Sequence, residues 1–277
     1  MHRDPLSVLV ATVGADATPD VLSRSMDGRL VAAFGPMVAK LGLPGEAQRT
    51  ATIMEAVSSA LGRHSVLVVP RVLWVRGDVL AMQRLAGESY RTLVPGGHGA
   101  VAMRRAGVAI AGLHSLHPPS LRHCTVGDHI SDLIRPQPVR LGQALPQLAE
   151  RIDAILRRVT TDHQPSAGAG VLHRDLHLGQ MLAIGERVAV VDWDLAALGD
   201  PALDLGNLRA YLCTRLPAVA ARLWDAFVDG YGDAMPVGID RFESLMYLRM
   251  ASKAYRLNTV AAAEQITSLV AAAEACW

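Results

Sequence analysis

The stretch from Val171 to Leu208 constrains the fold of this chain most, because two carboxylates stand at defined points of it with an amide side chain between them. The carboxylates are Asp175 and Asp192, and the amide is Gln180. The β-type run Val188–Val191 leads into Asp192, so this carboxylate stands where a strand leaves its sheet. Asp175 falls in a polar loop after a short apolar run. The pattern predicts a site built on two carboxylates.

The overall composition is that of a folded protein with one large domain or two lobes. The chain has 277 residues, and 51% of them are hydrophobic, which argues against disorder. The formal net charge of +1 leaves no overall basic surface for nucleic acid, and only 4% of the residues are aromatic, which gives little support to base stacking. We therefore expect no nucleic acid partner.

Nothing in the sequence indicates a thiolate metal centre, a membrane span or a signal peptide. Cys124, Cys213 and Cys276 stand far apart, with no CxxC pair among them. Pro70 and Arg71 interrupt the apolar run around residues 66–75, which is also too short to cross a bilayer. The first residues lack an apolar core with a cleavage site. We expect a soluble cytoplasmic protein without a membrane partner, either a monomer or a homodimer.

The first 85 residues favour short strands with one helix inserted among them. The helix is expected over residues 45–61, because Pro44 opens the segment and Gly62 closes it. The predicted strands are Ser7–Val13, Arg29–Phe34, Met37–Leu41, Val69–Val75 and Asp78–Arg84.

Lys40 is unusual, because the chain has only two lysines among its 27 basic residues and this one lies in an apolar strand-like run. A compact ammonium with rotatable donors suits phosphate binding. A lysine that protects the edge of a sheet from aggregation would explain the position equally well. On the following helix, Glu55 could pair with Lys40 and hold it. Glu46 is the weaker partner, because an acid in the first helical turn commonly just complements the helix dipole.

From residue 86 onward helices dominate, so the chain is expected to be an α+β protein with two lobes, residues 1–85 and 86–277. Residues 118–138 contain four prolines and are expected to form an irregular loop that faces a substrate. The other segments show apolar residues at helical spacing. These predicted helices are Ala100–Leu116, Leu141–Val159, Ala202–Arg215, Pro217–Tyr231, Ile239–Val260 and Ala261–Cys276.

The residue types around Asp175 allow two kinds of chemistry. His173, Asp175 and His177 alternate and would share one face of an extended segment, as metal ligands could. The wider pattern suits phosphoryl transfer better, since that reaction needs a group that positions a hydroxyl, oxygen ligands for a metal ion and a cation for the phosphates. Two carboxylates, an amide five residues after the first and a lysine in the preceding β-rich lobe meet those needs.

The order of these groups along the chain resembles that of the protein-kinase-like superfamily. Within it, HRDLHLGQ followed by VVDWDLAALGDPALDLGNL resembles the aminoglycoside phosphotransferase and choline kinase family, whose pattern is approximately HGDLHxxN, D[FW]D and GDPxxDL. The resemblance is strong over Val171–Leu208 and looser over Val69–Leu73, Leu80–Gly87 and Ala111–His114. It implies a bilobal protein-kinase-like fold, with a small β-rich N-terminal lobe and a larger, mainly helical C-terminal lobe.

The resemblance also implies a role for each matching residue. Asp175 would position the substrate hydroxyl and accept its proton. Gln180 and Asp192 would hold Mg²⁺, with Asp194 assisting at the metal or supporting its ligands, and Lys40 would contact the α- and β-phosphates.

Further roles concern the nucleotide and the loop that carries Asp175. The backbone of a hinge would contact adenine, and Asp204 would brace the catalytic loop while Asp200 caps the next helix. The residues of this hinge are Met82, Gln83, Arg84 and Leu85.

This sequence departs from the family pattern in three places. Gln180 replaces the usual Asn, which adds one methylene between the backbone and the amide. Related sugar kinases resemble this chain in having Gln at this position. Arg174 replaces the usual Gly. The first strands contain no glycine-rich loop to cover the nucleotide, since Gly14 and Gly28 are isolated.

The HRD spelling raises the alternative of a protein kinase. Only a few residues separate Asp192 from Pro201, which leaves no room for a peptide-docking activation segment. A catalytically silent nucleotide-binding protein is a further alternative, but Asp175, Asp192 and Lys40 are all present.

The function implied by the resemblance is transfer of the γ-phosphate of ATP or GTP, with Mg²⁺, to a hydroxyl of a small molecule. An antibiotic is the preferred acceptor, in a resistance or self-protection role. A sugar, a choline-like alcohol or an amino-alcohol metabolite is the alternative. Seven acidic and seven basic residues balance each other after Gly206, which makes a highly cationic aminoglycoside less favoured.

Overall fold

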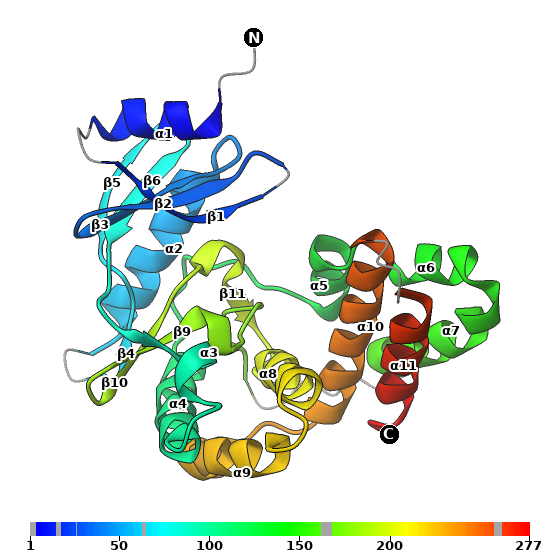
Figure 1. Cartoon of the computed structure of the whole chain (residues 1–277). Helices are drawn as coiled ribbons and strands as arrows, with labels where there is room; N and C mark the ends of the chain where they lie inside the picture. Colours follow the sequence, from blue (N-terminus) through cyan, green and yellow to red (C-terminus); the bar gives the residue numbers. More distant parts are fainter. Residues whose placement is uncertain (1–3, 15–17, 26, 63–64, 162–167, 258–261) are drawn as a thin grey trace.

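The computed structural model describes residues 4–14, 18–25, 27–62, 65–161, 168–257 and 262–277. A β-rich lobe contains the first strands, and a larger helical part follows it (Figure 1). No helix in these ranges combines the length and hydrophobicity that crossing a bilayer requires.

The N-terminal lobe is built on a five-stranded antiparallel sheet in the order β1-β2-β3-β6-β5. Most of these strands were predicted, but β1 was missed. Their bounds are β1 Asp20–Arg24, β2 Leu30–Phe34, β3 Met37–Leu41, β5 Val72–Arg76 and β6 Val79–Gln83. The predicted helix is confirmed as α2 (Glu46–Ala60), whose buried face packs beside β5 and β6.

Two sequence predictions in this lobe are wrong. Residues 7–13 form helix α1 (Pro5–Val13) instead of a strand, since Asp4 caps the helix through the Ser7 N–H and Pro5 occupies its first turn. The described part of the lobe therefore holds two helices, α1 and α2, whereas the sequence predicted one. Leu9 of α1 is buried in a separate small core against the sheet, together with Leu30 and Ala39.

The position of Lys40 excludes the edge-strand interpretation. Its strand β3 lies between β2 and β6 and is therefore central. Side chains alternate between the two faces of a strand. Ala39 faces the small core under α1, whereas Lys40 pairs in register with Leu80, which belongs to the core that contains α2. Lys40 thus points to the face that α2 covers.

A second sheet joins the N-terminal and C-terminal parts of the chain. It has the order β4-β10-β9-β7, and β4 runs parallel to β10. Its strands are β4 Leu67–Val68, β7 Glu88–Ser89, β9 Met181–Ile184 and β10 Arg187–Val190, and a separate two-stranded sheet pairs β8 Gly170–Leu172 with β11 Ala197–Gly199. β10 confirms the predicted strand before Asp192. The division after residue 85 stays a prediction, although β6 ends at Gln83.

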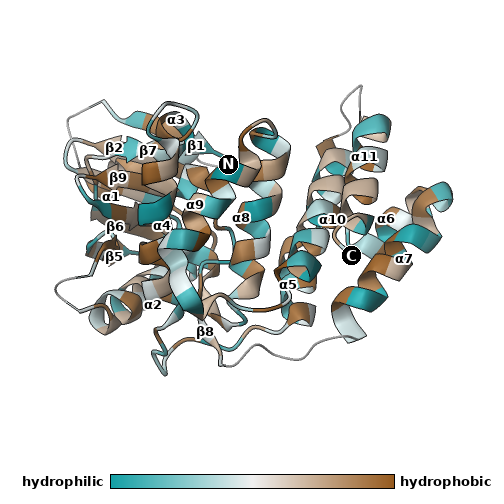
Figure 2. Ribbon diagram, turned by 90° about the horizontal axis from the view of Figure 1, so that it is seen from below, coloured by the Kyte–Doolittle hydropathy of each residue, from teal (hydrophilic) through white to brown (hydrophobic). Residues whose placement is uncertain are grey.

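The helices of the C-terminal lobe form two groups, which Figure 2 shows from below. One contains α4 (Gly99–His114), α8 (Ala202–Arg215) and α9 (Ala220–Tyr231). The other contains α6 (Pro138–Ala144), α7 (Pro146–Thr161), α10 (Ile239–Leu257) and α11 (Ala262–Glu274). The contact between α8 and α10 joins the groups.

Two predictions for this lobe need correction. The expected loop over residues 118–138 contains helix α5 (Val126–Leu133), which the Thr125–Asp128 capping box starts. The single helix expected over residues 141–159 is divided into α6 and α7, because Pro146 begins a new helix. A short helix, α3 (Tyr90–Leu93), precedes α4. Residues 258–261, part of two predicted helices, lie outside the described residues.

Two glycines of α4 provide a test of the packing between α4 and α9. A Cβ at Gly107 would lie 2.6 Å from the backbone nitrogen of Tyr231 and closer still to the Phe227 carbonyl oxygen. A Cβ at Gly112 would meet nothing within 4 Å. We expect Gly107→Ala to lower the free energy of unfolding by about 2–4 kcal/mol, measured by urea denaturation. Gly112→Ala should raise it by about 0.5–1 kcal/mol. Equal effects of the two substitutions would contradict this packing.

Candidate active site

The Asp175 loop (residues 173–177) follows β8 and is anchored by a buried carboxylate. Asp204, in the first turn of α8, accepts the backbone N–H of His173 at 2.6 Å and that of Arg174 at 2.7 Å. Burial opposes ionisation of Asp204, but the hydrogen bond and charge of His114 and the contacts from the loop lower its pKa overall. The bracing role that the resemblance implied for Asp204 is confirmed by this geometry. Asp200 accepts the N–H of Ala202 at 3.0 Å, at the start of the helix.

Arg174 occupies a backbone conformation that favours glycine, and its side chain makes contacts that a glycine could not make. Its φ of +66° lies in the left-handed region, which costs a side-chain-bearing residue about 1–2 kcal/mol. The buried guanidinium contacts the Asp132 carboxylate of α5 at 3.0 Å and the Leu195 carbonyl at 3.3 Å. Arg174 therefore ties the Asp175 loop to α5.

Asp175 itself is held from α10 rather than from its own loop. Arg249 Nη2 lies 2.9 Å from Asp175 Oδ1, and His177 Nε2 lies 4.0 Å from Oδ2. His177 Nδ1 accepts the Gly179 N–H at 2.9 Å, so a proton on its neutral ring is on Nε2, toward Asp175. The ring stacks on Tyr211 of α8, with centroids 5.2 Å apart. Sequence reasoning missed Arg249 and Tyr211.

The second carboxylate, Asp192, turns out of β10 with a φ of +69° and meets the lysine of the first lobe. Lys40 Nζ lies 2.6 Å from Asp192 Oδ1 and also pairs with Asp194. Burial disfavours the charged forms of Lys40 and Asp192, but their mutual attraction outweighs it, so the pKa of Lys40 is raised and that of Asp192 is lowered. Lys40 and Asp192 are therefore an ion pair across the lobes.

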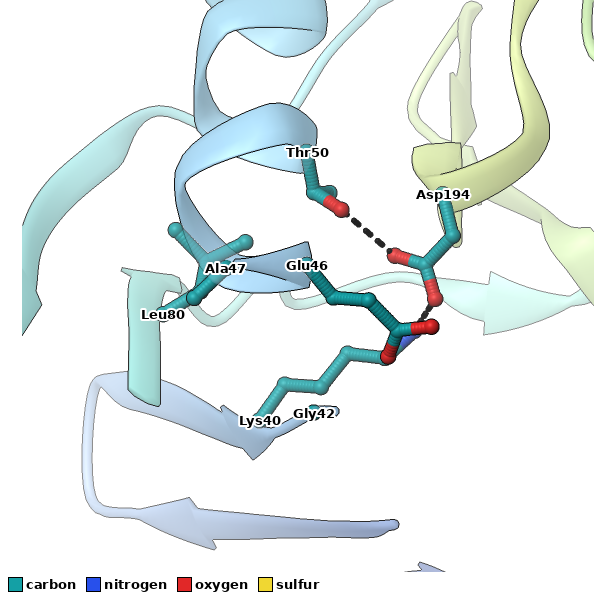
Figure 3. Close-up of a pocket in the computed structure, with 7 residues that line it drawn as sticks. All are labelled: Lys40, Gly42, Glu46, Ala47, Thr50, Leu80 and Asp194. Atoms are coloured by element: carbon teal, nitrogen blue, oxygen red, sulfur yellow. Dashed lines mark hydrogen bonds and ion pairs between the residues drawn. The ribbon is translucent and has the colours of Figure 1, made fainter. Parts of the chain in front are cut away.

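Helix α2 approaches this ion pair through Thr50. Its hydroxyl donates to Asp194 Oδ1 at 3.0 Å, and Figure 3 shows Asp194 between Thr50 and Lys40. The pocket beside them is lined by Lys40, Gly42, Glu46, Ala47, Thr50, Leu80 and Asp194.

The predicted contact of Lys40 with Glu55 is wrong. The side chain of Glu55 is exposed and lies outside the buried face of α2 that carries Thr50 and Met54. Lys40 has Asp192 and Asp194 as its partners. Glu46 lines the pocket but accepts from Arg29 Nε at 2.9 Å and from the Leu43 N–H at 2.8 Å.

Gln180 lies beside Asp192, as predicted. Its Nε2 donates to Asp192 Oδ2 at 3.2 Å. A metal ion held by both residues would need the carbonyl oxygen of the amide, which this orientation turns away from Asp192. Rotation of the amide exchanges the two atoms without moving the backbone.

The His-x-Asp-x-His metal interpretation is wrong. Within the described ranges, no three His, Cys, Asp or Glu side chains converge as metal ligands. His173 Nε2 instead contacts the Val191 carbonyl at 2.8 Å, and the His177 ring is stacked on Tyr211. An oxygen-rich pair, Asp192 with Gln180, is the donor set that the geometry offers.

The hinge assignment to Met82, Gln83, Arg84 and Leu85 stays a prediction. Two of its backbone N–H groups are engaged within the lobe, since Gln83 donates to the Arg71 carbonyl at 2.9 Å and Arg84 donates to the Pro36 carbonyl at 2.8 Å. A ligand that needs a backbone N–H donor from this hinge would have to use its last residue, Leu85.

The assembled site has a carboxylate at one end, Asp175, and a carboxylate–amide–lysine group at the other. The profile of the phosphotransferase enzyme family matches residues 23–238 of this chain. The chain belongs to the phosphotransferase enzyme family. Enzymes of this family that resemble it act on hydroxyl groups of small molecules. A comparison with curated proteins finds no significant match.

Solved structures of the phosphotransferase family share the fold over nearly the whole chain. A choline/ethanolamine kinase family protein from Mesorhizobium loti is 17% identical, with a TM-score of 0.66 over 98% of this chain and 92% of that one. A macrolide 2′-phosphotransferase from Brachybacterium faecium is 21% identical, with a TM-score of 0.60 over 98% of each chain. An amicoumacin kinase is 10% identical, with a TM-score of 0.73 over 99% and 94%. These likenesses confirm the predicted protein-kinase-like fold.

The ion pair of Glu46 with Arg29 makes a pH-dependent contribution to stability in this phosphotransferase. The hydrogen bond from Arg29 lowers the pKa of Glu46 from its usual 4.5 to about 2. A lowered carboxyl pKa stabilises the fold above the usual value, and this stabilisation is lost as the pH falls from 4.5 toward 2. We expect Glu46→Gln to lower the free energy of unfolding by about 1–2 kcal/mol at pH 7, with a shrinking difference below pH 4.

The matched control is the exposed Glu55 of the same helix. Glu55→Gln should change the free energy of unfolding by less than about 0.5 kcal/mol at either pH. Chemical denaturation at several pH values measures both variants. A larger effect at Glu55 than at Glu46 would refute the assignment.

Proposed function

We propose that this protein transfers the γ-phosphate of ATP, or of GTP, to a hydroxyl group of a small molecule with the help of Mg²⁺. The observation that carries the proposal is the convergence of Lys40, Gln180 and Asp192 from separate parts of the chain, with Asp175 on the neighbouring loop. A second observation is that the amicoumacin kinase structure holds AMP-PNP and Ca²⁺.

The residues present fit a magnesium nucleotide. Mg²⁺ is usually held by one or two carboxylates together with substrate phosphates and water. Asp192 supplies a carboxylate with a lowered pKa, Gln180 supplies an amide oxygen after rotation, and Asp194 lies within reach of the same lysine. When bound, the metal would neutralise charge on the phosphates.

The remaining residues supply positioning and proton transfer. Lys40 exchanges its contact with Asp192 for the phosphates of the nucleotide, while Asp194 and Thr50 keep its ammonium in the pocket. Asp175 Oδ2 accepts the proton of the acceptor hydroxyl, since Arg249 already occupies Oδ1. The anchored backbone of the Asp175 loop keeps this carboxylate in place during the reaction.

An antibiotic is the proposed acceptor. Two structural relatives are antibiotic kinases, a macrolide 2′-phosphotransferase and an amicoumacin kinase. The choline/ethanolamine kinase family protein supports a metabolite as the alternative acceptor. A screen of antibiotics and hydroxylated metabolites, with mass detection of a phosphate adduct, separates the two. Turnover of metabolites alone would refute the antibiotic role.

Two single substitutions test the residue roles. We expect Asp192→Ala to lower kcat by at least about a hundredfold, because a metal ligand is lost. The chain should stay folded, because the surroundings of Asp192 are polar. Asp175→Ala should lower kcat by about 10²–10⁴-fold, because the proton acceptor is lost. ADP release and adduct formation measure both, and circular dichroism reports folding.

The exposed Glu55 again provides the control, and Glu55→Gln should keep kcat within about twofold. Full activity of Asp192→Ala would exclude the metal role. Nucleotide binding by the unmodified protein with no turnover of any acceptor would favour a silent nucleotide-binding protein.

A further inference from the structure

Cationic side chains lie beside Asp175 on the side that faces α10 and α3. Arg249 contacts its carboxylate at 2.9 Å. The pKa of His177 is lowered, first by burial and then by the positive charges of nearby groups that include Arg249 and Arg91, against the opposing effect of Asp175. Cations from α10 and α3 therefore act on the same point beside the Asp175 loop.

Two helices extend this positive character outward from the loop. Helices α8 and α10 lie in contact along their length, since Gly206 packs on Phe242 and Thr214 Oγ1 lies 3.9 Å from Met250 Sδ. The earlier residue of α8 contacts the earlier residue of α10, and the later residue contacts the later one. The two helices therefore run parallel. Tyr211 of α8 stacks on His177 of the loop, and Arg249 of α10 contacts Asp175. Asp204 and Asn207, nearer the beginning of α8, also bind the loop.

Three exposed cations lie after Tyr211 and Arg249 along the two helices. Arg215 stands four residues after Tyr211 on α8, and on α10 Lys253 and Arg256 stand four and seven residues after Arg249. At helical spacing these positions share a face with the residue that touches the loop. Among the residues that the structure describes, none of the three forms an ion pair.

No carboxylate of either helix neutralises this face. The sequence holds no Asp or Glu over residues 205–215 or 244–257. The acids at the beginnings of the two helices are engaged elsewhere: Asp204 holds the Asp175 loop, and Asp240 and Glu243 pair with Arg209. Cations in a last helical turn also complement the helix dipole, which could account for Arg215 and Arg256. That explanation covers neither Lys253 nor Arg249, which lie further inside α10.

We infer that the acceptor carries an anionic group, such as a carboxylate, sulfate or phosphate, that lies against Lys253, Arg256 and Arg215 while its hydroxyl reaches Asp175. The inference rests on the proposed kinase function. The helical rise of 1.5 Å per residue places Lys253 and Arg256 about 6–10 Å from Arg249 along α10. The anionic group would therefore lie at about this distance from the hydroxyl that reaches Asp175. A polycationic acceptor meets repulsion at the same face.

The test uses hydroxylated compounds in sets that share one scaffold and differ in charge, such as glucuronate, glucose and glucosamine, within a wider library sorted the same way. Phosphate transfer is measured by mass detection. Binding is measured separately by ligand-observed NMR with the unmodified protein in the absence of nucleotide, so that it does not depend on turnover. We expect anionic members to bind and react best, and added salt to weaken their binding.

The double substitution Lys253→Glu with Arg256→Glu examines the cationic face itself. The KM for an anionic acceptor should rise about tenfold, with kcat and the KM for the nucleotide unchanged, and the salt dependence should be lost. Arg222→Glu, a single charge reversal at an exposed position of α9, should leave all three values unchanged.

Each outcome decides one question. Preference for neutral or cationic members, absence of binding by any anionic member, or an unchanged KM in the double variant would overturn the inference. Charge-selective binding without phosphate transfer would support the anionic acceptor and contradict the proposed kinase function.

Discussion

The buried carboxylate of Asp204 is the interaction on which the rest of the site depends. It accepts the N–H groups of two successive loop residues, His173 and Arg174, and His114 Nε2 lies 3.3 Å from the oxygen that binds His173. A fully buried charge without such partners would be costly, so α4, α8 and the loop are stable only in this mutual arrangement. His114 in turn contacts the Tyr231 hydroxyl at 2.8 Å, which adds α9 to the same network.

The second constraint is the ion pair between the lobes. Lys40 is carried on a central strand, where its side-chain direction is set by the alternation of β3, and Asp192 leaves β10 in a left-handed conformation. The ammonium of Lys40, whose side chain is 13% exposed, lies 2.6 Å from the Asp192 carboxylate, so the two charges attract although the Asp192 side chain is 42% exposed. Thr50 connects Asp194 to α2, so this helix supports the lysine through a hydroxyl and a neighbouring carboxylate rather than through its own glutamate.

The same logic distinguishes the two sides of Asp175. Toward Gln180, the carboxylates Asp192 and Asp194 are matched by Lys40. Toward α8 and α10, cations exceed carboxylates, and Arg249 is the first of them. The cationic acceptor wall that we propose would give a charge preference different from that of a site built for polycationic compounds, whatever fold the two proteins share.

The candidate site was visible in the sequence, because Asp175, Gln180 and Asp192 are close in the chain and their spacing follows from one loop and one strand. The strands around Lys40 and helix α2 were likewise predictable from apolar periodicity and turn residues. Local signals misled where a helix cap outweighed a β-branched run, as in α1, and where Pro146 divided one apolar stripe between two helices. Only the tertiary structure decided which partners meet. Glu55 faces solvent, Thr50 faces Asp194, and Arg249 reaches Asp175 from a helix much later in the chain, because such contacts depend on how whole helices pack and not on any spacing that the sequence displays.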